Sequence, residues 1–163
     1  MNKYMIVAGG ALLGVSFAAF AADECSQVTD NLVKNCGFET GCFADWAATY
    51  TTVVDAGEIA HSGEFGVQFL ARDTVAWIGQ GLSTTAGQAY TVSFWLRNVQ
   101  ASNHLELWWD DVLIYDAADL PATPYQQVVI EGVVASSDSA MFWLGITNPN
   151  GDVYVDDVVV VPQ

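Results

Sequence analysis

The residues best suited to chemistry in this chain are three tryptophans, Trp95, Trp108 and Trp143, in three separate short segments rich in Val, Leu, Phe and Thr. In each segment every second residue is aliphatic or Phe, a pattern that predicts a strand with one face in a core. The tryptophans alternate with that set and are therefore expected on the outward face. Large aromatic rings gain most when they are buried, so outward indoles indicate a surface that binds flat apolar groups, such as the C–H faces of sugar rings.

Planar polar side chains accompany these tryptophans in the same pattern. Arg97, Glu106 and Gln68 are predicted on the outward faces and suit sugar hydroxyls, and Trp77 could extend the aromatic row. The alternative is that a loop or the N-terminal segment covers the tryptophans and turns them into a second small core. Alternation in short segments also slips by one residue wherever a strand contains a bulge.

The three cysteines, Cys25, Cys36 and Cys42, predict one disulfide and one free thiol. A Cys36–Cys42 bond closes the shorter loop and is our first expectation, whereas pairing with Cys25 would hold the N-terminal tail. A zinc site is disfavoured, because neither His61 nor His104 is spaced from the cysteines as zinc ligands usually are. The remaining thiol would suit a covalent dimer.

The N-terminus has the features of a secretory signal peptide. Lys3 precedes an apolar stretch over 6–20, and small residues at 19 and 21 form a cleavage site, so residues 1–21 are expected to be removed. Residues 22–163 then form a single domain, exported to an extracellular or periplasmic location where disulfides persist. No later segment is apolar enough for membrane insertion.

Charge restricts the partners. The whole chain has a formal net charge of −15, with 19 acidic residues and four basic ones, one of which lies in the signal peptide. Nucleic acids and anionic membrane surfaces would be repelled. Neutral ligands and divalent cations remain as partners.

The pattern after residue 45 is β throughout. Short Val-, Trp-, Phe- and Thr-rich segments are separated by turn sequences such as HSGE, TTAGQ and TNPNGD, and no window keeps helical periodicity. This predicts an all-β antiparallel sandwich or barrel. The expected strands are 65–70, 90–98, 104–111, 127–135, 140–147 and 153–161.

Five motifs in order resemble the carbohydrate-binding modules of the cellulase-C type, families four, nine and twenty-two. They begin with NLVKNCGFETG and FADW, whose counterparts open those modules, and end with GDVYVDDVVVV, which resembles their closing strand. The motifs lie at 31–46, 61–69, 78–98, 120–136 and 151–161. The resemblance implies a galactose-binding-like jelly-roll β-sandwich without catalytic machinery, which binds a polysaccharide or other glycan. Cys36 and Cys42 depart from the family pattern and would be a lineage-specific staple.

The resemblance also implies a structural calcium where the N-terminal motif meets the last strand. Glu39 lies at the family's ligand position, Asp156 and Asp157 lie in the closing motif, and Ser62 belongs to a loop that can supply further oxygens. Simple alternation places Asp157 toward the core, while the family pattern favours Asp156, so both stay candidates with a slight preference for Asp156. The alternative is that these acids only deter edge pairing of the sheet.

Two other classes of function are alternatives to non-catalytic glycan binding. Glu106 with Asp110 or Asp111 could form a carboxylate pair for glycoside hydrolysis, but paired acids are common in so acidic a chain, and we expect no enzyme. A structural or adhesion protein of the cell surface or matrix could use the same sandwich for self-association. We therefore expect a secreted, calcium-stabilised jelly-roll domain that binds carbohydrate on an aromatic sheet face.

Overall fold

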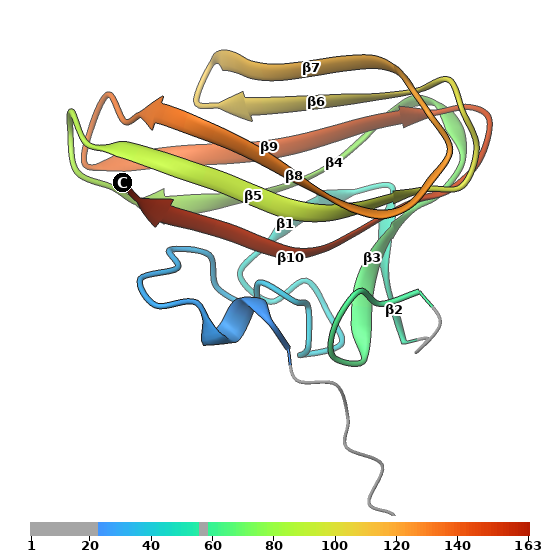
Figure 1. Ribbon diagram of the computed structural model, residues 1–163, viewed down its shortest axis with the longest axis horizontal. Helices are drawn as coiled ribbons and strands as arrows, with labels where there is room; N and C mark the ends of the chain where they lie inside the picture. The colour runs from blue at the N-terminus through green and yellow to red at the C-terminus, as the bar shows by residue number, and fades with distance from the viewer. Residues whose placement is uncertain (1–22, 56–58) are drawn as a thin grey trace, which may run out of the picture.

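The computed structural model describes residues 23–55 and 59–163. The predicted signal peptide, 1–21, lies outside this part of the chain. The described residues form one short 3₁₀ turn, η1 (Cys25–Gln27), and ten strands in two antiparallel sheets (Figure 1). The predicted all-β sandwich is confirmed. Among the described residues, no helix has the length and apolar character needed to cross a membrane.

Each sheet has five strands, and the chain passes repeatedly from one sheet to the other. The first sheet has the order β1-β4-β9-β6-β7, with bounds β1 (Ala47–Thr49), β4 (Arg72–Ser83), β9 (Ser139–Asn148), β6 (Asn103–Trp109) and β7 (Val112–Leu120). The second sheet has the order β2-β3-β10-β5-β8, with bounds β2 (Thr51–Asp55), β3 (Phe65–Phe69), β10 (Val153–Pro162), β5 (Ala89–Asn98) and β8 (Thr123–Val134).

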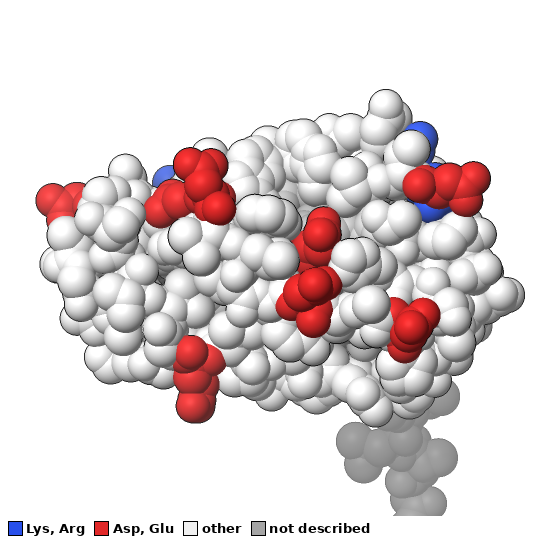
Figure 2. All heavy atoms as spheres, turned by 90° about the horizontal axis from the view of Figure 1, so that it is seen from above, with Lys and Arg blue, Asp and Glu red and all other residues white. Residues whose placement is uncertain are grey.

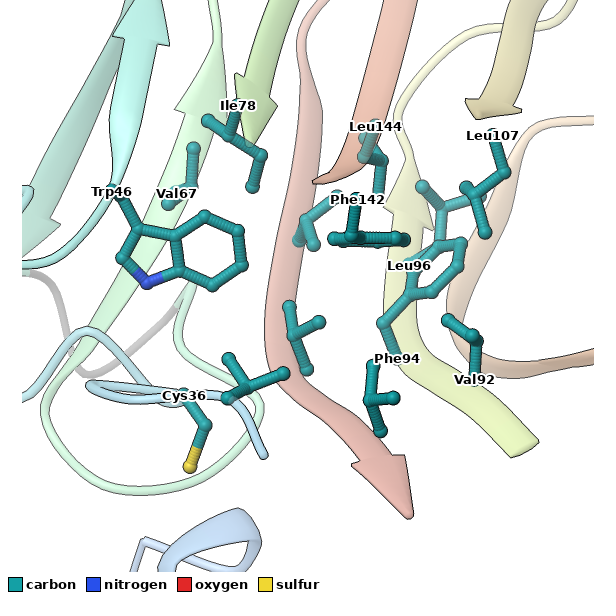
Figure 3. Packing of buried hydrophobic residues seen from close by; sticks show 14 of the residues in the cluster. Cys36, Trp46, Val67, Ile78, Val92, Phe94, Leu96, Leu107, Phe142 and Leu144 are labelled. Atoms are coloured by element: carbon teal, nitrogen blue, oxygen red, sulfur yellow. The ribbon is translucent and has the colours of Figure 1, made fainter. Parts of the chain in front are cut away.

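The core lies between the sheets and is built from the predicted inward set. Phe94 and Leu96 of β5 and Phe142 and Leu144 of β9 are all buried, and Figure 3 shows them in the space between the two layers. Because side chains alternate along a strand, burial of this set turns the intervening residues outward on both sheets. The sandwich therefore has two outer faces.

The N-terminal segment completes the second sheet beside β10. β10 pairs with β3 only over Val153–Val155, and a bulge follows between Asp156 and Val159. Beyond the bulge the N-terminal segment takes the place of β3: the Val158 N–H donates to the Cys36 carbonyl at 3.0 Å, and the Leu32 N–H donates to the Val160 carbonyl at 2.9 Å. The bulged part of β10 and this segment thus satisfy the hydrogen-bonding needs of each other's backbone N–H and C=O groups.

The predicted Cys36–Cys42 disulfide is wrong. The structure has a Cys25–Cys36 bond with an S–S distance of 2.01 Å, and Cys42 is free and exposed. Loop length favoured the closer pair in sequence, but Cys25 and Cys36 are both buried where η1 packs against the N-terminal motif. The bond ties the start of the domain to the segment that covers β10.

We predict that replacing Cys25 and Cys36 together with Ser lowers the free energy of unfolding by about 3 kcal/mol, because the bond closes a loop of a dozen residues in the unfolded chain. The C42S variant is the matched control and should unfold like the wild type. Denaturant unfolding measures both. Alkylation without reduction should label Cys42 alone, and labelling of Cys25 in place of Cys42 would contradict the pairing.

Candidate functional site

The structure divides the predicted sugar-binding residues between two opposite faces. Trp77, Glu106, Trp108 and Trp143 project from the first sheet, whereas Trp95, Arg97 and Gln68 belong to strands β5 and β3 of the second. The prediction of one shared face is therefore wrong. Alternation distinguishes inward from outward residues, but it does not tell which of two sheets a strand joins.

The first-sheet set forms a cavity of about 310 Å³, here called the tryptophan cleft. Strand register brings the set together: Trp143 of β9 lies opposite Trp108 of β6. Two residues further along β9, Gly145 lies between Trp77 of β4 and Glu106 of β6. The cleft is lined by Val75, Trp77, Glu106, Trp108, Trp143 and Gly145.

Two indoles meet at a right angle in this cleft. The rings of Trp77 and Trp143 are 4.7 Å apart between centroids, with an angle of 89° between their planes. Trp143 lies over Gly79 of β4, where an added Cβ would come within 2.0 Å of the indole carbon Cε3. Only glycine leaves room for this ring, and the Trp77, Trp108 and Trp143 side chains remain half-buried. They form the walls of a cleft, not the second core that was the alternative.

The polar chemistry of the cleft comes from one carboxylate among its lining residues, that of Glu106. A carboxylate accepts hydrogen bonds from hydroxyl groups, and the indole rings supply apolar surface beside it. Such a cleft can bind a ligand that combines C–H faces with hydroxyls.

The second-sheet set is engaged with other parts of the protein. The ring of Trp95 stacks on His61 at 3.8 Å between centroids, with planes 14° apart. Gln68 Nε2 donates to the carboxylate of Asp152 at 2.7 Å. The Arg97 guanidinium lies 5.5 Å from the ring centroid of Tyr154. These residues form no common cleft with the tryptophans of the first sheet.

Next to His61, the bulge of β10 buries two consecutive acids. Asp156 is 0 % and Asp157 3 % exposed. Asp157 has a φ of 49°, a left-handed conformation that is uncommon for non-glycine residues and that breaks the alternation. The bulge explains why both acids are buried, although alternation places only Asp157 toward the core.

Both buried carboxylates accept several hydrogen bonds. Asp156 accepts from the N–H groups of His61 at 2.8 Å, Ser62 at 3.2 Å and Asp157 at 2.7 Å. Asp157 accepts from the Ser62 hydroxyl at 2.8 Å and from the Cys25 N–H at 3.1 Å, and its other oxygen lies 2.7 Å from His61 Nδ1. The 61–62 loop and η1 are thus held to β10 through these two acids.

Glu39 holds the next residues of the same loop. Its carboxylate accepts from the N–H groups of Glu64 at 3.1 Å and Phe65 at 3.0 Å. Gly63 has a φ of +64°, and a Cβ there would lie 2.2 Å from Glu39 Oε1, so the approach requires glycine.

Asp23 is a further member that the sequence motifs did not indicate. Burial, together with the negative charges of Asp157 and Glu39, raises the pKa of Asp23. Its position just after the predicted cleavage site carries no recognisable signal, so only the folded arrangement reveals it. We call Asp23, Glu39, Asp156 and Asp157, with Ser62, the carboxylate cluster.

The carboxylate cluster has the chemistry of a hard-cation site. Burial, together with the neighbouring charge of Asp157, raises the pKa of Asp156 to about 8. Several carboxylates with a hydroxyl and loop carbonyls are the oxygen donors that calcium prefers. The donor types therefore suit calcium, and the residues that carry them include all four predicted from the sequence.

Comparison with known families gives one match: a family model described as a carbohydrate binding domain, of families 4 and 9, matches residues 30–140. A comparison with curated proteins finds no match.

Solved structures of several carbohydrate-binding modules share the fold. A module named TmCBM61, solved with β-1,4-galactotriose, superposes with a TM-score of 0.68 at 23% identity, covering 82% of this chain and 99% of that one. The CBM22-1 xylan-binding domain of Paenibacillus barcinonensis Xyn10C gives 0.57 at 16% identity, covering 77% and 90%. The structure of a family 16 carbohydrate-binding module, module 2, superposes with a TM-score of 0.59 at 19% identity, covering 80% of this chain and 99% of that one.

The raised pKa of Asp156 predicts a pH dependence of stability in the presence of a chelator. The native carboxyl keeps its proton up to about pH 8, whereas in the unfolded chain it ionises near 3.8. The native state binds more protons between these values, so the free energy of unfolding should fall as pH rises from about 4 to about 8. Asn cannot ionise, and D156N should flatten this slope in urea titrations at a series of pH values. Equal slopes in the two proteins would contradict the assignment.

Proposed function

The chain belongs to the family of carbohydrate-binding domains whose model covers residues 30–140, and we propose that it is a secreted, non-catalytic domain that holds a glycan in the tryptophan cleft. The observation that carries the proposal is the right-angled pair of Trp77 and Trp143 beside Trp108, with Glu106 at the cleft wall. One indole can stack on the C–H face of a sugar ring while the perpendicular indole contacts its edge. Glu106 then accepts hydrogen bonds from hydroxyls.

The charge of the chain supports a neutral glycan as the ligand. Figure 2, viewed from the side of β7, shows acidic groups in separate patches with uncharged surface between them and basic groups only near the edges of the view. The formal charge of −15 disfavours approach of uronate-rich or sulfated polysaccharides. The first glycans to test are neutral ones such as β-1,4-galactan and xylan. One structural neighbour was solved with β-1,4-galactotriose, and another is a xylan-binding domain.

A binding role without catalysis is supported by family membership and by the position of the acids. Asp110 and Asp111, the acids that could pair with Glu106 in a hydrolase, line a different pocket with Trp109 and Val112 at the β6–β7 turn. A hydrolase needs two carboxylates on either side of one scissile bond. Glu106 and these two acids therefore do not line one pocket.

The carboxylate cluster is proposed to hold a structural calcium ion. Glu39, Asp156, Asp157 and Ser62, with Asp23, would hold it, and its charge would neutralise the buried acids. These residues come from the N-terminal segment, the 61–64 loop and β10. Binding would therefore stabilise the closure of the N-terminal segment over the bulge.

Export and self-association complete the proposal. The buried Cys25–Cys36 disulfide supports an oxidising, extracellular or periplasmic location. The exposed free thiol of Cys42 favours a second candidate role, a surface or matrix protein that forms covalent dimers. Non-reducing electrophoresis separates the two: a dimer band that C42S removes would support the second role.

For glycan binding, we predict that W143A and W108A abolish retardation in affinity electrophoresis against neutral polysaccharides, a loss of at least about tenfold in affinity, or about 1.4 kcal/mol. Their melting temperatures should change little, because both rings are half-buried on the outer face. W109A, which removes the adjacent core indole, should instead lower the free energy of unfolding by about 3–5 kcal/mol.

W95A provides the matched control on the second sheet and should keep its retardation. Equal loss of binding in W95A and W143A would contradict the cleft. Failure of the wild type on every polysaccharide of a broad neutral panel would contradict glycan binding itself.

For calcium, we predict that chelation lowers the melting temperature of the mature protein and that added calcium restores it. E39Q and D157N should lose this response, since each removes a carboxylate of the cluster. E131Q removes one negative charge from exposed β8 and should respond like the wild type. A melting temperature unmoved by both chelator and calcium would contradict the proposal.

A further inference from the structure

Beside the tryptophan cleft, the first sheet brings the imidazole of His104 and the carboxylate of Asp116 next to the cleft residue Glu106, and the calcium proposal uses none of the three. We propose that His104, Glu106 and Asp116 bind a divalent transition-metal ion, with Zn²⁺ as the representative ion. One ligating atom from each of the three residues lies within 4.8 Å of the other two.

The pairing of β6 with β7 produces this arrangement. Glu106 and Asp116 are directly opposed partners, and His104 lies two residues before Glu106 on the same strand. Residues i and i+2 share one face of a strand, so all three side chains leave the same outer face of the sheet. His104 Nε2 already lies 2.5 Å from Asp116 Oδ1. The site is therefore set by strand register and not by a loop.

The donor types and distances suit zinc. Zn²⁺ accepts imidazole nitrogen and carboxylate oxygen at roughly 2.0–2.2 Å, which places neighbouring ligands of a tetrahedral ion about 3.3 Å apart. The His104–Asp116 contact must then open by less than about 1 Å on binding. Both side chains can move this far, because they are 37 % and 55 % exposed.

Electrostatics favours a cation at this point. Like charges directly opposite on neighbouring strands destabilise a sheet, and the Glu106 and Asp116 carboxylates are such a pair. An ion bound between them would offset this repulsion. The imidazole distinguishes the site from the oxygen-rich carboxylate cluster, because nitrogen ligands favour zinc, copper and nickel over calcium.

Glu106 links this metal site to the cleft, since it lines the cleft as well. Zinc with three protein ligands keeps a fourth position for water or another oxygen. If the proposed glycan binding holds, that position lies at the cleft edge and can take a sugar hydroxyl. Only this consequence rests on the proposed function; metal binding itself does not.

The test is calorimetric titration of the mature protein with zinc chloride in saturating calcium, which occupies hard-cation sites. We expect H104Q to remove the zinc heat. D116N should weaken binding by more than the 10- to 100-fold that is typical of residues that only support a metal ligand. E131Q, which removes the same charge on β8, should bind zinc like the wild type. The melting temperatures of H104Q and D116N confirm that these surface variants fold.

His61 is the other histidine of the chain and needs its own control, because Glu24, His61 and Asp157 also lie within 4.8 Å of one another. Zinc binding that survives H104Q and is lost in H61Q would overturn the proposal and place the ion there. The absence of zinc heat in the wild type would also overturn it and leave His104–Asp116 as an ion pair only. A separate experiment compares how strongly polysaccharide retards the protein with and without zinc, and it tests whether the bound ion contributes to glycan binding in the cleft.

Discussion

The register of β9 between β4 and β6 is the constraint on which the outer face of the first sheet depends. In this register Phe142 and Leu144 fill the core while Trp143 and Gly145 face outward. A slip of one residue would exchange the two sets, which the core does not permit. Core packing thus holds Trp143 over Gly79 and beside Trp108, so the cleft is a consequence of how the sandwich closes.

The second sheet is organised differently, by a bulge that interrupts regular pairing. The bulge leaves β10 without β3 as a partner and turns Asp156 and Asp157 into the protein together. Buried acids at this spacing require donors or a cation, and η1 and the 61–64 loop supply the donors. This arrangement explains why the family signature at 31–46 and the closing strand, far apart in sequence, form one unit.

Much of this could be predicted from the sequence, because alternation reports burial directly. Phe94 and Phe142 are core residues as expected, and the grouping of Trp77, Trp108, Trp143 and Glu106 survives in the folded protein. Four features could not be obtained in this way. The assignment of Trp95 to the other sheet depends on strand order, which alternation does not contain.

The other three depend on tertiary structure. The Cys25–Cys36 bond depends on η1 packing against the N-terminal motif, whereas loop length pointed to Cys42. Asp23 joins the carboxylate cluster only when the N-terminal segment folds back on β10. The burial of both Asp156 and Asp157 follows from a bulge, a feature with no reliable sequence signal in this strand.

The most direct measurement of glycan binding at the tryptophan cleft is a ¹⁵N–¹H NMR titration that follows the six indole N–H groups. The ligand is an oligosaccharide fragment of whichever polysaccharide retards the protein most in affinity electrophoresis. The account predicts that the signals of Trp77, Trp108 and Trp143 shift in a saturable way. The signals of the other three, Trp46, Trp95 and Trp109, should stay in place. A saturable shift confined to Trp95, or spread equally over all six, would contradict it.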